Sequence, residues 1–134
     1  QGVAVALVYD WLGSILAHYS GFFKPLIAAG AEVKPYNRIG WVSGIGLLSR
    51  NHRKSFVIDE KIAFVSGLCI SSAWNGKPDH GVPPWRDTGV KIEGAAVAQV
   101  LAAFEDTLTA QNGTLPKRFG RILHNTGQGR AMCV

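Results

Sequence analysis

The strongest constraint on the fold is a βαβ pattern in the first part of the chain. Residues 2–10, GVAVALVYD, form a short run rich in Val and Leu, which is typical of a buried strand. Residues 31–36, AEVKPY, form a second predicted strand. A helix is predicted between them at about residues 16–29, ending at Gly30, because apolar side chains recur at helical spacing: Leu16, Tyr19, Phe22, Phe23, Leu26 and Ile27. Two strands joined through a helix run parallel, so the sequence predicts a compact βαβ unit.

The middle of the chain predicts an antiparallel hairpin. Strands are expected at about residues 52–58 and 62–70, and the link near residues 59–61 is short enough to require a tight reversal. A Pro/Gly-rich loop at residues 75–86 then leads into a further predicted strand at residues 88–94.

An amphipathic helix is predicted at residues 95–111, with an apolar face formed by Val97, Val100, Leu101, Phe104 and Leu108. Residues 112–134 show no convincing pattern. Alternating strands and helices place the chain in the α/β class, with a mixed β-sheet flanked by helices. We therefore expect one domain at residues 1–111, followed by a basic tail or linker at residues 112–134.

Charge and cysteine content limit the class of protein. The formal net charge is +5, and residues 117–134 hold four Lys or Arg and no acid, so residues 1–116 are nearly neutral. A basic tail either contacts phosphates and anionic lipid headgroups or is only solvated, and both interpretations stay open. The longest stretch without Asp, Glu, Lys or Arg, residues 62–76, is shorter than the roughly 20 residues of a membrane-spanning helix. Cys69 and Cys133 match neither a disulfide framework nor a zinc pattern, so reduced thiols are expected.

Polar side chains stand in the predicted strand around NHRKSFVID, residues 51–59. Because side chains alternate across a strand, His52 and Lys54 are expected on one face, about 6–7 Å apart. His52 can attack or carry a proton near neutral pH and Lys54 is a fixed cation, so the pair suits a phosphate. Ser66 and Gly67 leave room for a ligand beside this face, and their backbone amides can face an anion. The alternative is a solvent-exposed strand face with ordinary charges.

The segment HRKSFVID fits the pattern H-x-K-x4-D, with His52, Lys54 and Asp59 at its fixed positions. This pattern resembles the motif of the phospholipase D superfamily. Three further segments, GVAVALVYDWLGS, AAGAEVKPYN and PWRDTGVKIEGAAV, resemble the bacterial cardiolipin synthase-like branch of that superfamily. The resemblance covers roughly residues 2–108 and implies a phospholipase D-like half-domain.

The resemblance implies phosphodiester chemistry that uses no metal and no cofactor. In this family the motif His attacks phosphorus to form a phosphohistidine, and the His of a second motif copy protonates the departing alcohol. Carried over, His52 is the nucleophile or the acid/base partner, and Lys54 holds phosphate oxygens. Asp59 is expected to stabilise the structure of the motif. Asp87, in WRDT, matches an acid that orients the motif His; the alternative is a strand-entry or turn residue.

The sequence departs from the family pattern in two ways. It holds one motif copy, because His18, His80 and His124 have no Lys two residues later. The second half is expected from a homodimer partner or from another part of a longer polypeptide, and the start at Gln1 favours a fragment of a longer polypeptide. The segment SGLC also places Cys69 where the family usually has Asn, whose amide a thiol cannot replace as a strong donor.

Three functions remain as expectations. The first is hydrolysis or phosphatidyl transfer on a phospholipid substrate, by a bacterial protein of the cytoplasm or the inner-membrane surface, with the membrane surface as a partner. The second is a homodimeric nuclease of the same superfamily, although nucleic acid is a less expected partner because residues 1–116 are nearly neutral. The third is a non-catalytic half-domain used for assembly or lipid binding.

Overall fold

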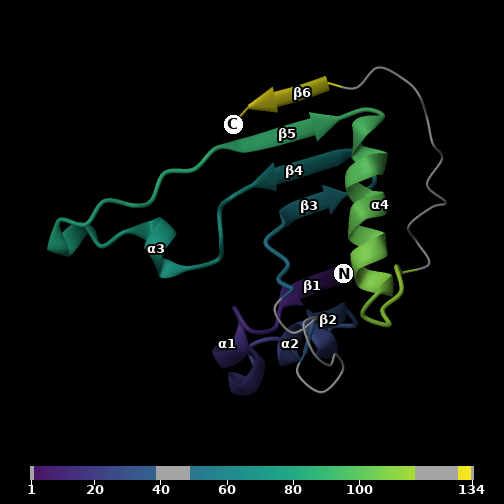
Figure 1. The fold of residues 1–134 in the computed structure, drawn as a ribbon, viewed down its shortest axis with the longest axis horizontal. Helices are drawn as coiled ribbons and strands as arrows, with labels where there is room; N and C mark the ends of the chain where they lie inside the picture. The colour runs from purple at the N-terminus through teal and green to yellow at the C-terminus, as the bar shows by residue number, and fades with distance from the viewer. Residues whose placement is uncertain (1, 39–48, 117–129, 134) are drawn as a thin grey trace. The chain divides into compact units, whose positions relative to one another are not determined.

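The computed structural model describes residues 2–38, 49–116 and 130–133. The chain divides into two compact units: the first unit comprises residues 1–52 and 102–122, and the second unit comprises residues 53–101 and 123–134. The chain contains both helices and strands, interspersed along its length, which confirms the α/β class (Figure 1). The parallel and antiparallel strand pairs belong to two separate sheets, one in each unit.

A two-stranded parallel sheet forms the frame of the first unit. β1 (Ala6–Asp10) pairs with β2 (Glu32–Tyr36), so that Asp10 stands opposite Tyr36 at the carboxyl ends of both strands. α1 (Ile15–Ser20) and α2 (Lys24–Ala28) connect the two strands (Figure 1). The predicted βαβ connection and its parallel pairing are confirmed.

The prediction of a single helix at residues 16–29 is wrong, because two short helices occupy this segment. Gly21 ends α1 as its C-cap with φ 79°, a left-handed conformation that glycine adopts without steric cost. Pro25 then lies in the first turn of α2, where a missing backbone N–H costs nothing. Most of the apolar residues that indicated this helix are exposed: Leu16, Tyr19, Phe22, Leu26 and Ile27.

Aromatic contacts attach these helices to β1. The ring of Phe23, before α2, stacks on Tyr9 with centroids 4.1 Å apart. The Tyr9 hydroxyl and Nδ1 of His18 on α1 share a hydrogen bond of 2.5 Å. One aromatic residue of β1 therefore contacts residues of both helical segments.

The expected stop at Gly30 is confirmed. Gly30 has φ 90°, and its N–H donates to the Ile27 carbonyl oxygen at 2.9 Å. The Ala31 N–H donates to the Leu26 carbonyl oxygen at 3.0 Å. These two bonds form a Schellman motif, which satisfies the carbonyls at the end of α2 before β2 begins.

An antiparallel sheet in the order β3–β4–β5–β6 forms the second unit: β3 (Lys54–Ile58), β4 (Ile62–Ser66), β5 (Gly89–Glu93) and β6 (Arg130–Cys133). The predicted hairpin is confirmed in β3 and β4, although β3 begins at Lys54 and β4 ends at Ser66. β6 pairs with β5 and lies in the stretch for which the sequence predicted no structure.

The loop between β4 and β5 contains two short helical turns, α3 (Ser72–Asn75) and the 3-10 helix η2 (Pro78–His80). The rings of Trp74 and Trp85 meet edge to face, with centroids 5.0 Å apart. The Lys77 N–H donates to the Val82 carbonyl oxygen at 2.8 Å. Short local contacts therefore shape this Pro/Gly-rich segment.

α4 (Ala96–Thr109) confirms the predicted amphipathic helix. Val97, Leu101 and Leu108 are buried, while Val100 and Phe104 are half-buried. Burying one aliphatic side chain of this size contributes about 1.5–3 kcal/mol, so this stripe is a main part of the apolar core among the described residues. Within those residues, no helix has both the length and the apolar character that crossing a bilayer requires.

Candidate functional site

The residues of the motif come from both units. His52 is the last residue of the first unit at this point of the chain, and it lies in an exposed loop before β3. Lys54 is the first residue of β3 in the second unit and is half-buried. Because β3 begins at Lys54, strand alternation does not set the direction of His52. Hydrogen bonds hold residues 49–51, which precede His52.

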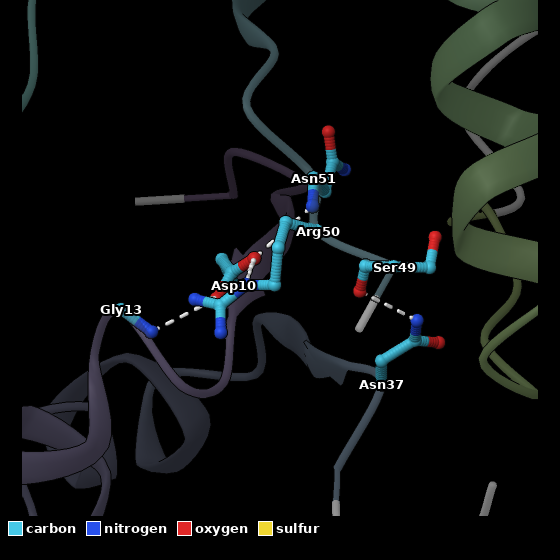
Figure 2. A network of polar contacts seen from close by, with 6 residues as sticks. All are labelled: Asp10, Gly13, Asn37, Ser49, Arg50 and Asn51. Carbon is cyan, nitrogen blue, oxygen red and sulfur yellow. Dashed lines mark hydrogen bonds and ion pairs between the residues drawn. The ribbon is translucent and has the colours of Figure 1, made fainter. Parts of the chain in front are cut away.

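Asp10, the last residue of β1, contacts the chain directly before His52 (Figure 2). Its Oδ2 accepts hydrogen bonds from the backbone N–H of Asn51 and from Nε of Arg50, each at 3.0 Å. Its Oδ1 accepts from the backbone N–H of Gly13 at 2.9 Å and forms an ion pair with Nη2 of Arg50. Both carboxylate oxygens therefore have two donors, and the Arg50 contact is bidentate.

These contacts keep Asp10 ionised. Burial by itself raises the pKa of this carboxyl group. The backbone N–H groups of Gly13 and Asn51 and the Arg50 guanidinium lower it, and together they outweigh burial, so the pKa of Asp10 is below its usual value of 3.8. At neutral pH the pair is a carboxylate facing a guanidinium, with the Asp10 side chain 16% exposed and the Arg50 side chain 31% exposed.

Residues at the carboxyl end of β2 contact Ser49, the residue before Arg50. Nδ2 of Asn37 donates to the Ser49 carbonyl oxygen at 2.9 Å (Figure 2), and the Tyr36 hydroxyl lies 3.3 Å from Oγ of Ser49. Asn37 has φ 48°, and its backbone N–H donates to Oε1 of the buried Gln111 at 3.1 Å. Residues 49–51, the anchored segment, are therefore held by the adjoining ends of both parallel strands.

In the second unit, Lys54 and Ser66 stand directly opposite each other in the β3–β4 pairing. Directly opposed residues of an antiparallel pair place their side chains on the same face of the sheet. Ser66 is also opposite Gly89 of β5, which adds no side chain to that face. The structure thus brings a cation and a hydroxyl together on one sheet face.

Asp87 lies against Gly67, the residue after β4. A Cβ atom at Gly67 would be 2.3 Å from Oδ2 of Asp87 and 2.9 Å from its Cγ, so this arrangement requires glycine. Oδ1 of Asp87 accepts a hydrogen bond from the Thr88 N–H at 2.7 Å, directly before β5 begins. Lys54, Ser66, Gly67 and Asp87 therefore gather in one part of the second unit.

Asp59 lies at the other end of β3 from Lys54, about 16 Å away along the strand. Asp59 (φ 50°) and Glu60 (φ 58°) form the hairpin turn, which the Lys61 N–H closes by donating to the Ile58 carbonyl oxygen at 3.0 Å. This place suits the structural role expected of Asp59.

Cys69 is a free, half-buried thiol whose Sγ lies 3.8 Å from the Gly67 carbonyl oxygen, a weak contact. Cys133 falls in β6, and its side chain lies outside the described ones. Within the described part of the chain, no three His, Cys, Asp or Glu side chains group closely enough to hold a metal ion.

Sequence reasoning missed Asp10, Arg50, Asn37 and Gln111. One signal was present, because Asp10 ends a predicted parallel strand and sites in α/β proteins gather at such ends.

Comparison with known proteins finds bacterial cardiolipin synthases. The chain is 36% identical over 108 residues to cardiolipin synthase A of Pseudomonas fluorescens SBW25. It is 36% identical over 116 residues to cardiolipin synthase 1 of Bacillus cereus ATCC 14579, and 39% identical over 106 residues to the cardiolipin synthase of Clostridium perfringens SM101.

These three matches cover 79%, 84% and 78% of this chain, but only 22%, 22% and 21% of the relatives. The chain thus spans about a fifth of the length of the curated relatives it matches. No family model and no solved structure matches the chain.

Proposed function

We propose that this chain, which belongs to the cardiolipin synthase-like branch of the phospholipase D superfamily, supplies one half of an active site for phosphatidyl transfer or phosphodiester hydrolysis on phospholipids. The match to cardiolipin synthases carries the proposal. Because it covers more than three quarters of the chain, it necessarily includes the motif at residues 52–59.

His52 is the nucleophile in the proposed reaction. One imidazole nitrogen attacks the phosphorus atom of the phosphodiester, a P–N bond forms, and the P–O bond to the departing alcohol breaks. The departing oxygen takes a proton from a second acid. Water or another alcohol then attacks phosphorus and gives its proton to that group, and the P–N bond breaks to regenerate His52.

Lys54 and Ser66 hold the phosphate in this proposal. The ammonium of Lys54 balances charge that develops on the non-bridging oxygens, and the hydroxyl of Ser66 donates a hydrogen bond to one of them. Their opposed positions on β3 and β4 support these roles. The backbone N–H of Gly67 supplies a further donor, and Asp87 accepts a hydrogen bond from an imidazole N–H of His52 and so fixes its tautomer.

The proposed reaction needs a second acid, and the chain carries one copy of the motif. We assign that acid to a second phospholipase D-like half, contributed by the same polypeptide or by a partner copy. The substrate is a phospholipid at a membrane surface, and the protein acts in the bacterial cytoplasm or at the inner membrane.

A substrate with a good leaving group tests the proposal on this chain alone. Phosphatidyl-p-nitrophenol releases p-nitrophenolate without needing a proton from the second acid. We expect a burst of p-nitrophenolate that approaches one equivalent per chain, followed by slow release because turnover lacks its second half. We call this measurement of p-nitrophenolate release the burst assay.

Histidine and lysine controls make the burst assay specific. His52→Ala should abolish the burst, while His80→Ala, at an exposed histidine of η2, should leave it unchanged. Lys54→Gln should slow the burst, and Lys61→Gln in the same hairpin should not. A burst that survives His52→Ala would overturn the proposed function.

Two further substrates separate the alternatives. Bis(p-nitrophenyl) phosphate reports phosphodiester chemistry without a lipid, and single-stranded DNA reports a nuclease. Faster burst kinetics with the lipid substrate than with bis(p-nitrophenyl) phosphate support a lipid enzyme. Cleavage of DNA that depends on His52 would favour the nuclease instead.

A further inference from the structure

We propose that Asp10 is a positioning residue for His52 and acts through Arg50 and Asn51. The inference rests on the proposed function, in which His52 is the nucleophile. Asp10 never touches the substrate in this account. It fixes the backbone from which the imidazole projects.

Asp10 makes more hydrogen bonds than are required to stabilise the turn that follows β1. The bond from the Gly13 N–H to Oδ1 is enough to stabilise the turn after β1, as an Asp side chain commonly does. The contacts with Arg50 and Asn51 join residues forty and forty-one positions later in the chain. They therefore serve the segment that leads into His52.

Few rotations separate the anchor from the imidazole. Asp10 holds the N–H of Asn51, and each residue has only two soft backbone dihedrals. Between that N–H and Cβ of His52 lie φ and ψ of Asn51 and φ of His52. The bidentate contact with Arg50 fixes the preceding residue as well (Figure 2).

A second, independent contact acts on the same segment. Asn37, directly after β2, holds the carbonyl oxygen of Ser49 at 2.9 Å. The buried Gln111 holds the backbone of Asn37 in turn. Three consecutive residues are therefore tied to the carboxyl ends of two parallel strands, the edge at which α/β folds build their sites.

The charge of Asp10 strengthens these bonds, because charge-assisted hydrogen bonds are shorter and stronger than neutral ones. Asn at position 10 keeps the shape of the side chain and can still accept from Gly13 through its oxygen. Its NH₂ group cannot accept from Asn51 or Arg50. Asp10→Asn therefore removes the bonds from the Asn51 N–H and from Nε of Arg50, leaves one uncharged acceptor for Nη2 of Arg50, and preserves the local turn.

The test applies the burst assay to the complete chain carrying Asp10→Asn. We expect the maximal burst rate constant to fall about 100-fold, as for a misplacement of about 1 Å, while the half-saturating substrate concentration changes less than about twofold. Arg50→Lys keeps the charge but not the bidentate fork, so it should give a smaller loss. The double variant should lose little more than Asp10→Asn alone, because both act through one contact.

Glu32→Gln is the matched control, because it removes another carboxylate of the first unit. Glu32 pairs with Lys34 at 3.2 Å, and among the described residues it has no hydrogen bond to residues 49–51. Glu32→Gln should leave the burst unchanged. Hydrogen exchange supplies a readout that needs no activity: the Asn51 amide should be protected in the parent chain and in Glu32→Gln, and should exchange faster in Asp10→Asn.

The outcomes separate this inference from the proposed function. A burst that depends on His52 but stays within twofold in Asp10→Asn would overturn the positioning role and leave the function standing. Loss of burst amplitude in proportion to the unfolded fraction would also overturn it, because the role would then be stability alone. A burst that survives His52→Ala would overturn both. Slow bursts of full amplitude, with an unprotected Asn51 amide, support the inference.

Discussion

Replacing Gly67 by alanine tests whether the Asp87 carboxylate acts in the site. The new Cβ atom would lie 2.3 Å from Oδ2 of Asp87, and ordinary van der Waals contact begins near 3.4 Å, so the carboxylate must retreat by about 1 Å. Gly67 has no left-handed φ, so alanine itself fits its backbone. The perturbation is therefore a displacement of one carboxylate.

The cost of this displacement should fall on activity more than on stability. Gly67 and Asp87 are both exposed, so the carboxylate can rotate into solvent and the free energy of unfolding should fall by less than about 1 kcal/mol. A shift of about 1 Å at a reacting centre costs about 100-fold in rate. The burst assay should therefore show a rate constant about 100-fold lower, with thermal unfolding nearly unchanged.

Asp87→Ala supplies the control for the same site. If Gly67→Ala acts through the carboxylate, adding it to Asp87→Ala should change the burst rate no further. A burst rate within twofold of the parent chain in Gly67→Ala would show that the Asp87 carboxylate does not act in the site. It would leave Asp87 as a strand-entry residue that bonds the Thr88 N–H.

Three further predictions concern stability and are measured by thermal or denaturant unfolding. Glu60→Gly should stabilise the hairpin by about 0.5–1 kcal/mol, because Glu60 has φ 58° and glycine removes that strain at a smaller entropic cost; a lower midpoint would contradict it. Gly113→Ala should destabilise by about 1–3 kcal/mol, since its Cβ would lie 2.5 Å from Cδ1 of the buried Leu108; an unchanged midpoint would contradict it. The pKa of Asp10 in the folded protein lies below its usual 3.8. The ionised Asp10 therefore contributes fully to the free energy of unfolding above pH 3.8, and this contribution is lost as the pH falls through the pKa of the folded protein. The stability difference between the parent chain and Asp10→Asn should therefore be constant near neutral pH and shrink in acid; a difference that grows in acid would contradict the sign.

Periodic patterns in the sequence predicted the main elements correctly. The paired apolar runs gave β1 and β2, the short reversal gave β3 and β4, and the apolar stripe gave α4, because each pattern reflects burial of one face. The prediction of one helix at residues 16–29 failed because a single glycine ends the first helix, whatever the spacing of the apolar residues. Gly21 adopts φ 79° and divides the segment, although the apolar spacing continues across it.

β6 could not be predicted for a different reason. The strand Arg130–Cys133 is four residues long, too short to show alternation, and it forms by pairing with the edge of β5. Its structure depends on a partner strand that lies about forty residues earlier in the chain. Local propensity carries no information about such a pairing.

The sequence indicated some residues of the candidate site and not others. Spacing and the resemblance indicated His52, Lys54 and Asp59, because these residues are close in sequence. The anchors were not indicated, because Asp10 and Arg50 lie forty positions apart and meet only through the fold. Polar residues at the carboxyl end of a predicted parallel strand are the signal that can find them.

Mapping the covalent intermediate tests directly whether His52 is the nucleophile. The chain would be treated with phosphatidyl-p-nitrophenol, quenched at alkaline pH to preserve the P–N bond, digested, and analysed by mass spectrometry. We predict one phosphatidyl group per chain, on the peptide that contains His52, removable by acid and absent in His52→Ala. A phosphatidyl group on any other residue, or a burst of p-nitrophenolate with no group attached to the protein, would contradict the account.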